Sequence, residues 1–169
     1  DANPNRMNTI QTLFQRYLPE EEYPELQKQL YTRIQDDRNA MHYPELLTWV
    51  FIQSKDYASA FRQVKAMERR LKENGGRVYN LAQIAANDGD YDTAIDAYDY
   101  IVENKGITSS FYIDAKRQSL RVKRNKLVEG FQYTEAELKE LEAEYESFLN
   151  DFRRDKSTAS IILELAELE

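Results

Sequence analysis

Three dipeptides that pair an acidic residue with tyrosine recur at intervals of 34 residues, and this stride restricts the fold more than any other feature of the chain. They are Glu22-Tyr23, Asp56-Tyr57 and Asp90-Tyr91. Apolar residues keep the same stride in further columns, which hold Leu13, Leu47 and Leu81; Tyr17, Phe51 and Ala85; and Leu26, Ala60 and Ala94. A constant period of this length indicates a helical repeat array, in which each unit buries its apolar face only against its neighbours.

Each repeat unit is predicted to contain two helices. In the clearest unit, the first helix carries Leu81, Ala82 and Ala85 on one face. The polar run at residues 87–90 predicts a tight turn, after which a second helix has its own apolar face, formed by Ala94, Ala97, Tyr98 and Ile101.

Small residues at positions 60, 82 and 94 would let paired helices approach closely. Glycines at residues 75, 76 and 106 are predicted to end the second helices, because glycine readily takes the left-handed conformation there. Repeat-column tyrosines are expected to pack in the core; they are Tyr17, Tyr23, Tyr57, Tyr91 and Tyr98.

Composition agrees with an all-α chain and removes several classes of function. Apolar residues make up 41% of the chain, enough for a continuous core, whereas five glycines and four prolines are too few for an all-β fold. The absence of cysteine excludes disulfides, thiolate metal sites and cysteine nucleophiles. A net charge of −7 argues against nucleic acid as a partner, and no apolar stretch is long enough to span a membrane. Localisation stays open between exported and cytoplasmic.

The pattern resembles the tetratricopeptide repeat (TPR) family. The residues that carry this resemblance are Leu81, Ala82, Gly89, Asp90, Tyr91, Ala94 and Tyr98. It covers residues 75–108 well and 41–74 fairly, whereas the unit at 7–40 departs from the pattern at Leu26 and at the prolines that flank its turn, Pro19 and Pro24. The resemblance implies an all-α fold in which antiparallel helix pairs form a right-handed superhelical stack.

We therefore expect a single α-solenoid domain over residues 6–169, with units at about 7–40, 41–74, 75–108 and 109–156 and the first helix of a further unit at 157–169. The fourth unit is expanded, and Thr134 with Glu137 predicts a capping box for its second helix. The last helix is apolar most of the way round, from Ile161 to Leu168. This favours a fragment of a longer repeat protein and self-association through that helix.

Catalytic and metal sites find little support in the sequence. His42 is the only histidine and has no evident partner for proton transfer. Asp88, Asp90 and Asp92 are spaced like the start of a calcium loop, but Thr93 and Asp99 stand where its glycine and glutamate belong. We expect no catalytic residue, cofactor or metal.

One helix carries a basic cluster, formed by Lys116, Arg117, Arg121, Lys123, Arg124 and Lys126. Two interpretations remain open. The three arginines lie on one helical stripe and could bind an acidic peptide. Alternatively, the cluster pairs with the glutamate-rich helix that follows, over residues 135–146.

The family resemblance implies that first helices line a concave groove. The partner-binding residues that we predict there are Trp49, Gln53, Tyr79, Asn80, Gln83, Asn87, Arg117 and Arg121. Trp49 is large and amphipathic, as binding hot spots often are, but it could equally be a core residue.

The expected function is a non-enzymatic scaffold that binds a protein or peptide in this groove. Two alternatives remain. The groove could capture a glycan or a small ligand on aromatic residues, or the chain could be the docking arm of an enzyme whose catalytic domain lies elsewhere.

Overall fold

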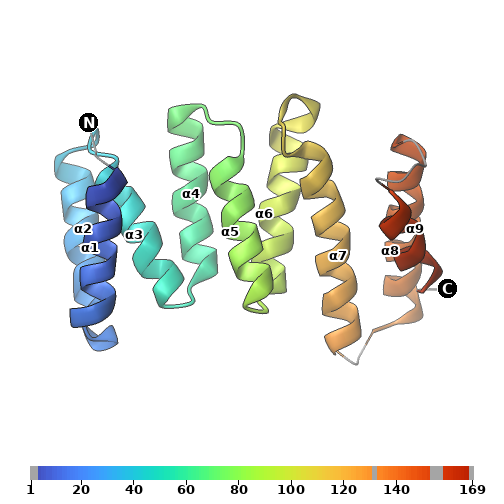
Figure 1. Cartoon of the computed structure of the whole chain (residues 1–169), viewed down its shortest axis with the longest axis horizontal. Coiled ribbons are helices and arrows are strands. Elements are labelled where there is room, and N and C mark those ends of the chain that lie inside the picture. Colours follow the sequence, from blue (N-terminus) through green and yellow to red (C-terminus); the bar gives the residue numbers. More distant parts are fainter. Residues whose placement is uncertain (1–3, 131–132, 153–157, 168–169) are drawn as a thin grey trace. The chain divides into compact units, whose positions relative to one another are not determined.

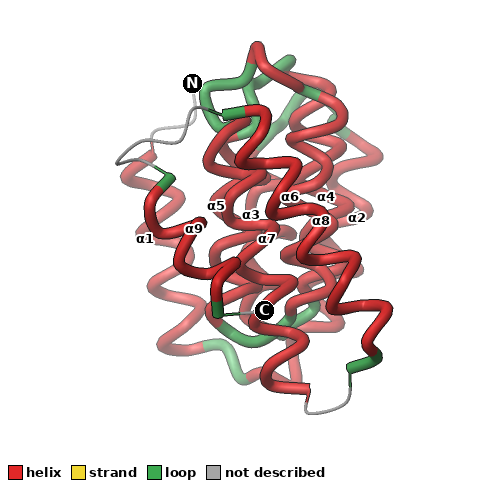
Figure 2. Tube along the Cα trace, turned by 90° about the vertical axis from the view of Figure 1, so that its right-hand side faces the viewer, coloured by secondary structure: helices red, strands yellow, loops and turns green. Residues whose placement is uncertain are grey.

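The computed structural model describes residues 4–130, 133–152 and 158–167, and the regular structure within these ranges is entirely helical (Figure 1 and Figure 2). Short 3-10 helices are η1 (Glu20–Glu22) and η2 (Gly106–Thr108). The α-helices are α1 (Pro4–Tyr17), α2 (Tyr23–Asp36), α3 (His42–Gln53), α4 (Tyr57–Leu71), α5 (Gly76–Asn87), α6 (Tyr91–Asn104), α7 (Tyr112–Gly130), α8 (Glu135–Asp151) and α9 (Ala159–Ala166).

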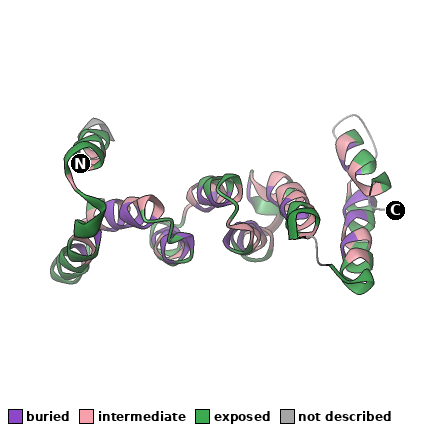
Figure 3. Ribbon diagram, turned by 90° about the horizontal axis from the view of Figure 1, so that it is seen from below, coloured by how far each residue is buried: buried purple, intermediate pink, exposed green. Residues whose placement is uncertain are grey.

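The chain divides into two compact units, residues 1–73 and 74–169. In the first unit, α3 packs against α2 and α4 and also contacts α1. In the second, each helix from α5 to α9 packs against the next one. Buried residues lie on the helix faces that meet these neighbours (Figure 3). The predicted all-α class and the packing of neighbouring helices are confirmed for the described residues.

All three acidic-tyrosine steps mark the start of a helix. The tyrosine is in each case the first residue of a helix, namely α2, α4 or α6, and the acidic residue is the N-cap before it. The Asp56 side chain accepts a hydrogen bond from the Ser59 backbone N–H at 3.0 Å, and Asp90 accepts from Thr93 at 3.1 Å. Glu22 makes no such capping bond.

The turn before each aspartate is also repeated at the stride of 34 residues. The backbone N–H groups of Asp56 and Asp90 donate to the carbonyl oxygens of Phe51 and Ala85, at 2.9 Å in both turns. One residue before the aspartate, Lys55 and Gly89 have positive φ angles of 55° and 85°. The periodic sequence thus specifies one helix–turn–helix geometry twice, once in each compact unit.

Small side chains hold these hairpins closed. Ala60 and Ala94 are fully buried at the positions where α4 faces α3 and α6 faces α5. Leu26 occupies the equivalent column in the first pair, where its bulk opposes a close approach. There α1 and α2 lie on opposite sides of α3 (Figure 2 and Figure 3). Alanine at this repeat position thus occurs in the two hairpins whose helices pack together, and leucine occurs in α2, which does not form such a hairpin with α1.

Two predictions for the first half of the chain are wrong. Leu13 and Tyr17, which the repeat register placed in the core, are 48% and 71% exposed because α1 turns a different face towards α3. Glycine does not end α4. Lys72 takes the left-handed C-cap conformation instead, with φ of 53°, and Gly75 precedes α5 as its N-cap. Gly106, with φ of 59°, follows α6 as predicted.

The expanded end of the chain contains the predicted capping box. The Thr134 side chain accepts from the Glu137 backbone, and the Glu137 carboxylate accepts from the Thr134 backbone N–H at 2.8 Å. These hydrogen bonds from Thr134 lower the pKa of Glu137, because they favour the charged carboxylate. Residues of α7, α8 and α9 share one core, which holds Leu120, Leu141, Tyr145, Phe148, Leu149 and Ile161.

Within the described ranges, no helix combines the length and the apolar character that a membrane span requires. The outer side of α9 leaves Ile162 and Leu163 exposed while Ile161 is buried. Self-association through this helix stays a prediction.

The capping difference predicts unequal effects of two equivalent substitutions. Asp90→Ala should lower the free energy of unfolding by about 1 kcal/mol, because the Thr93 backbone N–H loses its partner. Glu22→Ala should change it by less than about 0.5 kcal/mol, since Glu22 makes no capping bond. Urea unfolding followed by circular dichroism measures both. Equal effects would contradict the assigned role of the aspartate cap.

The closed hairpin predicts a strong effect of bulk at the α5–α6 interface. Ala94→Trp should destabilise the protein by about 3 kcal/mol, because the indole ring has no space between the two helices. Asp96→Trp on the exposed side of the same helix is the matched control and should have little effect. Thermal unfolding of the two variants makes the comparison.

Candidate partner-binding groove

A groove of about 700 Å³ runs along α5 and α7 in the second unit. Its floor is formed by Tyr98 and Val122, which are buried. Its rims carry polar side chains at helical spacing, three from each helix: Asn80, Gln83 and Asn87 on α5, and Gln118, Arg121 and Asn125 on α7. Residues seven apart on each helix face the same way, so the two rows run alongside the same open space.

The rims are rich in amides, which are the groups best suited to a backbone-like ligand. Each Asn or Gln side chain offers a carbonyl acceptor and an NH₂ donor, the same pair that a peptide bond presents. Four of these amide side chains are exposed and therefore accessible to a ligand from solvent: Asn80, Gln83, Asn87 and Asn125. Ile84, 41% exposed, adds an apolar contact between them.

Tyr79 forms part of an aromatic group at the α5 side of this unit. Its ring centroid lies 5.4 Å from that of Tyr98 and 5.2 Å from that of Phe111. Burial and the neighbouring Asp114 carboxylate raise the pKa of Tyr79, although Arg117 and Arg121 oppose the shift. The hydroxyl is therefore neutral and near the arginines of α7, while the ring packs against its aromatic neighbours.

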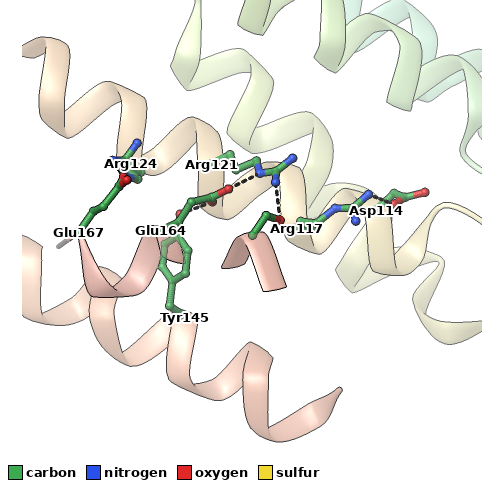
Figure 4. A network of polar contacts seen from close by, with 8 residues as sticks. Asp114, Arg117, Arg121, Arg124, Tyr145, Glu164 and Glu167 are labelled. Atoms are coloured by element: carbon green, nitrogen blue, oxygen red, sulfur yellow. Dashed lines mark hydrogen bonds and ion pairs between the residues drawn. The ribbon is translucent and has the colours of Figure 1, made fainter. Parts of the chain in front are cut away.

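The arginines of α7 form a row along one side of that helix (Figure 4). Arg117 pairs with Asp114 on the same helix. Arg121 donates from Nε to Glu164 of α9 at 2.8 Å and from Nη2 to Ser160 at 2.8 Å. Arg124 pairs with Glu167, just beyond α9. Two of the three acidic partners of the arginine row thus come from α9 and the residue that follows it.

The lysines of the same basic cluster face other helices. Lys123 donates to Glu144 of α8 at 2.7 Å, and Lys116 pairs with Asp151 at the end of α8. Lys126 pairs with Asp92 of α6. The expectation that this cluster pairs with the glutamate-rich helix therefore holds for Lys116 and Lys123, whereas the arginines occupy a separate stripe.

Six of the eight predicted partner-binding residues belong to this second unit. Asn80, Gln83, Asn87 and Arg121 line the groove, and Tyr79 and Arg117 lie beside it. Sequence analysis missed Gln118 and Asn125, although they stand three residues before and four after Arg121 on its helical face. It also missed Glu164 and Glu167, because nothing in the sequence pairs α9 with α7.

Trp49 and Gln53 lie on α3 in the first unit. The Trp49 ring is partly buried, and its centroid lies 6.4 Å from those of both Phe14 and Tyr23. These contacts join α1 and the start of α2 to α3. Trp49 therefore has a structural role in the first unit, and its role in binding stays a prediction.

No known family model, curated protein or solved structure matches the chain. The chemistry of the groove itself therefore has to indicate what it binds. In the described part of the chain, no cluster of histidine, aspartate or glutamate could hold a metal ion. His42 is exposed, and its ring centroid lies 4.1 Å from that of Tyr43 in a tilted arrangement; Asp90 is the N-cap of α6.

The aromatic contacts of Trp49 predict a measurable loss of stability in the first unit. Trp49→Ala should lower the free energy of unfolding by about 2–3 kcal/mol, because α1 loses its ring contact with α3. A double-mutant cycle with Phe14→Ala should give a coupling of about 0.5–1.5 kcal/mol. Gln53→Ala, one turn further along α3, is the control and should be nearly neutral. If Trp49→Ala left the free energy of unfolding unchanged, the ring would not be needed for stability, and this would favour a role in binding a partner.

Proposed function

We propose that this protein is a non-enzymatic interaction scaffold whose groove between α5 and α7 binds a peptide segment of a partner protein. The amide rows along both rims are the observation that carries the proposal. Side chains that mimic the peptide group at regular intervals suit a ligand that presents peptide groups at regular intervals. Nucleic acid suits these rims less well, since they carry a single arginine and the chain is acidic overall.

The dimensions of the groove fit a short extended segment. Helix α5 has 12 residues, so its length is about 18 Å at the rise of an α-helix. An extended chain advances about 3.3–3.6 Å per residue, which corresponds to about five peptide residues along the groove. A segment of this size occurs in exposed loops and chain ends of many proteins.

The chemistry of the lining also favours holding a ligand over transforming it. Amides do not titrate, and arginine side chains as a class do not act as bases in proteins. Tyr79, with its raised pKa, keeps its proton near neutral pH, so it is a poor acid and its phenolate is not available as a base. These groups position a ligand through hydrogen bonds and charge.

We further propose that the helix pairs belong to a TPR-type solenoid with a right-handed superhelical stack. The support is the recurrence of one turn geometry, with its aspartate cap and left-handed residue, at a stride of 34 residues. In such a stack, first helices such as α5 and α7 line the concave side. This arrangement accounts for the amide rows facing one common groove.

A peptide library displayed on phage tests the proposed function with the full chain as bait. Selected peptides should bind at least about tenfold more weakly to a Gln83→Ala, Asn87→Ala double variant, since each lost amide removes net hydrogen-bond energy of about 1 kcal/mol. Both side chains are exposed, so the stability of the double variant should be unchanged.

The matched control is Asp96→Ala, an exposed change on α6 outside the groove lining. It should bind the selected peptides as the original chain does. Selection that yields only peptides insensitive to the groove variant would contradict the proposed function.

A further inference from the structure

Helix α9 is held against α7 and α8 by apolar packing and by polar contacts of its acidic side chains. Ile161 is fully buried in the core that these three helices share. The Glu164 carboxylate receives hydrogen bonds from Arg121 and from the Tyr145 hydroxyl, the latter at 3.1 Å. Burial and Glu164 raise the pKa of Tyr145, so this hydroxyl keeps its proton and remains a donor. Glu167 pairs with Arg124 one turn further on.

The Arg121 side chain takes part in two sites, the groove and the contact with α9. It lines the amide groove between α5 and α7, and its guanidinium also reaches α9 (Figure 4). About a third of its side chain stays exposed. A carboxylate in the groove and the Glu164 carboxylate would therefore compete for one guanidinium.

We propose that the partner of the groove is an acidic peptide segment, one carboxylate of which binds Arg121 in place of Glu164. This inference rests on the proposed function and specifies its ligand. Charge complementarity carries it: the groove lining contains an arginine and no acidic residue. An arginine guanidinium binds carboxylates through paired hydrogen bonds, which adds geometric selectivity to the attraction.

The other two arginines of the row, Arg117 and Arg124, lie outside the groove lining. Their Nε groups are buried and have no hydrogen-bond partner within the described residues, so they are not accessible to a ligand in this arrangement of the helices. The lysines of α7 do not add to this row, because Lys116, Lys123 and Lys126 pair with carboxylates of α6 and α8. Arg121 is therefore the cationic side chain of α7 that a ligand in the groove would meet.

Helix α9 shows which chemistry the row accepts. Ser160 and Glu164 of α9, with Glu167 just beyond it, present a hydroxyl and two carboxylates at intervals of four and three residues, and all three contact arginines of α7. A partner segment with acidic residues would offer the same groups. Its binding would weaken the polar contacts of α9, although Ile161 still anchors that helix in the core.

The composition of the selected peptides is the first test. From the library described above, only peptides that depend on Gln83 and Asn87 are counted. We expect them to be enriched in Asp and Glu over the unselected library. Groove-dependent peptides without this enrichment would overturn the acidic ligand and leave the scaffold intact, whereas the absence of groove-dependent peptides would overturn both.

Three variants of the full chain then test the competition with one synthetic acidic peptide from the selection. Arg121→Gln should weaken its binding by at least about tenfold, since the charged donor is lost. Lys123→Gln, on the same helix but paired with α8, should leave affinity unchanged. Glu164→Gln should strengthen binding by about threefold or more, because the neutral amide competes less well for Arg121.

The gain from Glu164→Gln separates ligand competition from a purely structural ion pair. If the Arg121–Glu164 pair served only to hold α9, both substitutions would lower stability and neither would raise affinity. A second peptide with every Glu replaced by Gln and every Asp by Asn is the matched ligand control, and its affinity should not respond to Arg121→Gln. Circular dichroism melting checks that each variant is folded. Unchanged or weaker binding by a folded Glu164→Gln variant would overturn the inference.

Discussion

The close approach of paired helices around buried alanines is the constraint on which the rest of the structure depends. A short turn places two antiparallel helices side by side, and the distance between their axes depends on the size of the side chains at the contact. Ala60 and Ala94 are small and fully buried, and an aspartate cap starts the second helix at a set point. Because turn, cap and contact recur together, α5 and α6 take the arrangement of α3 and α4, and α5 is left with one side free to line a groove.

The departures from this rule have physical causes that can be named. Leu26 stands in the small-residue column of the first pair, and there α1 contacts α3 through Phe14 and Trp49. At the other end, α7 and α8 are longer than the repeat allows, and their shared core accepts Ile161 of α9. Longer helices bring more charged residues into one place. The basic residues of α7 accordingly divide between two sides, with lysines towards α6 and α8 and arginines towards α9 and the groove.

Much of the candidate site was within reach of sequence reasoning. The register that placed Leu81 and Ala85 inward also placed Asn80, Gln83 and Asn87 on the free side of the same helix, because helical geometry fixes one face once the other is known. Gln118 and Asn125 follow from Arg121 by the same spacing. The role of Trp49 was ambiguous, since a large amphipathic ring suits a core and a binding surface equally well. Its ring neighbours, Phe14 and Tyr23, belong to α1 and to the start of α2, so they are contributed by other helices.

By itself, the sequence determined the all-α class, the positions of the helix pairs and the repeated turn, because these depend on residues within a few turns of one another. Tertiary packing decided which face α1 buries, that Lys72 forms the C-cap of α4, and which partner each basic residue of α7 has. Arg121 and Glu164 are 43 positions apart. A local sequence pattern cannot pair charges that are so far apart in the chain. The pair forms because Ile161 packs α9 into the core that it shares with α7 and α8.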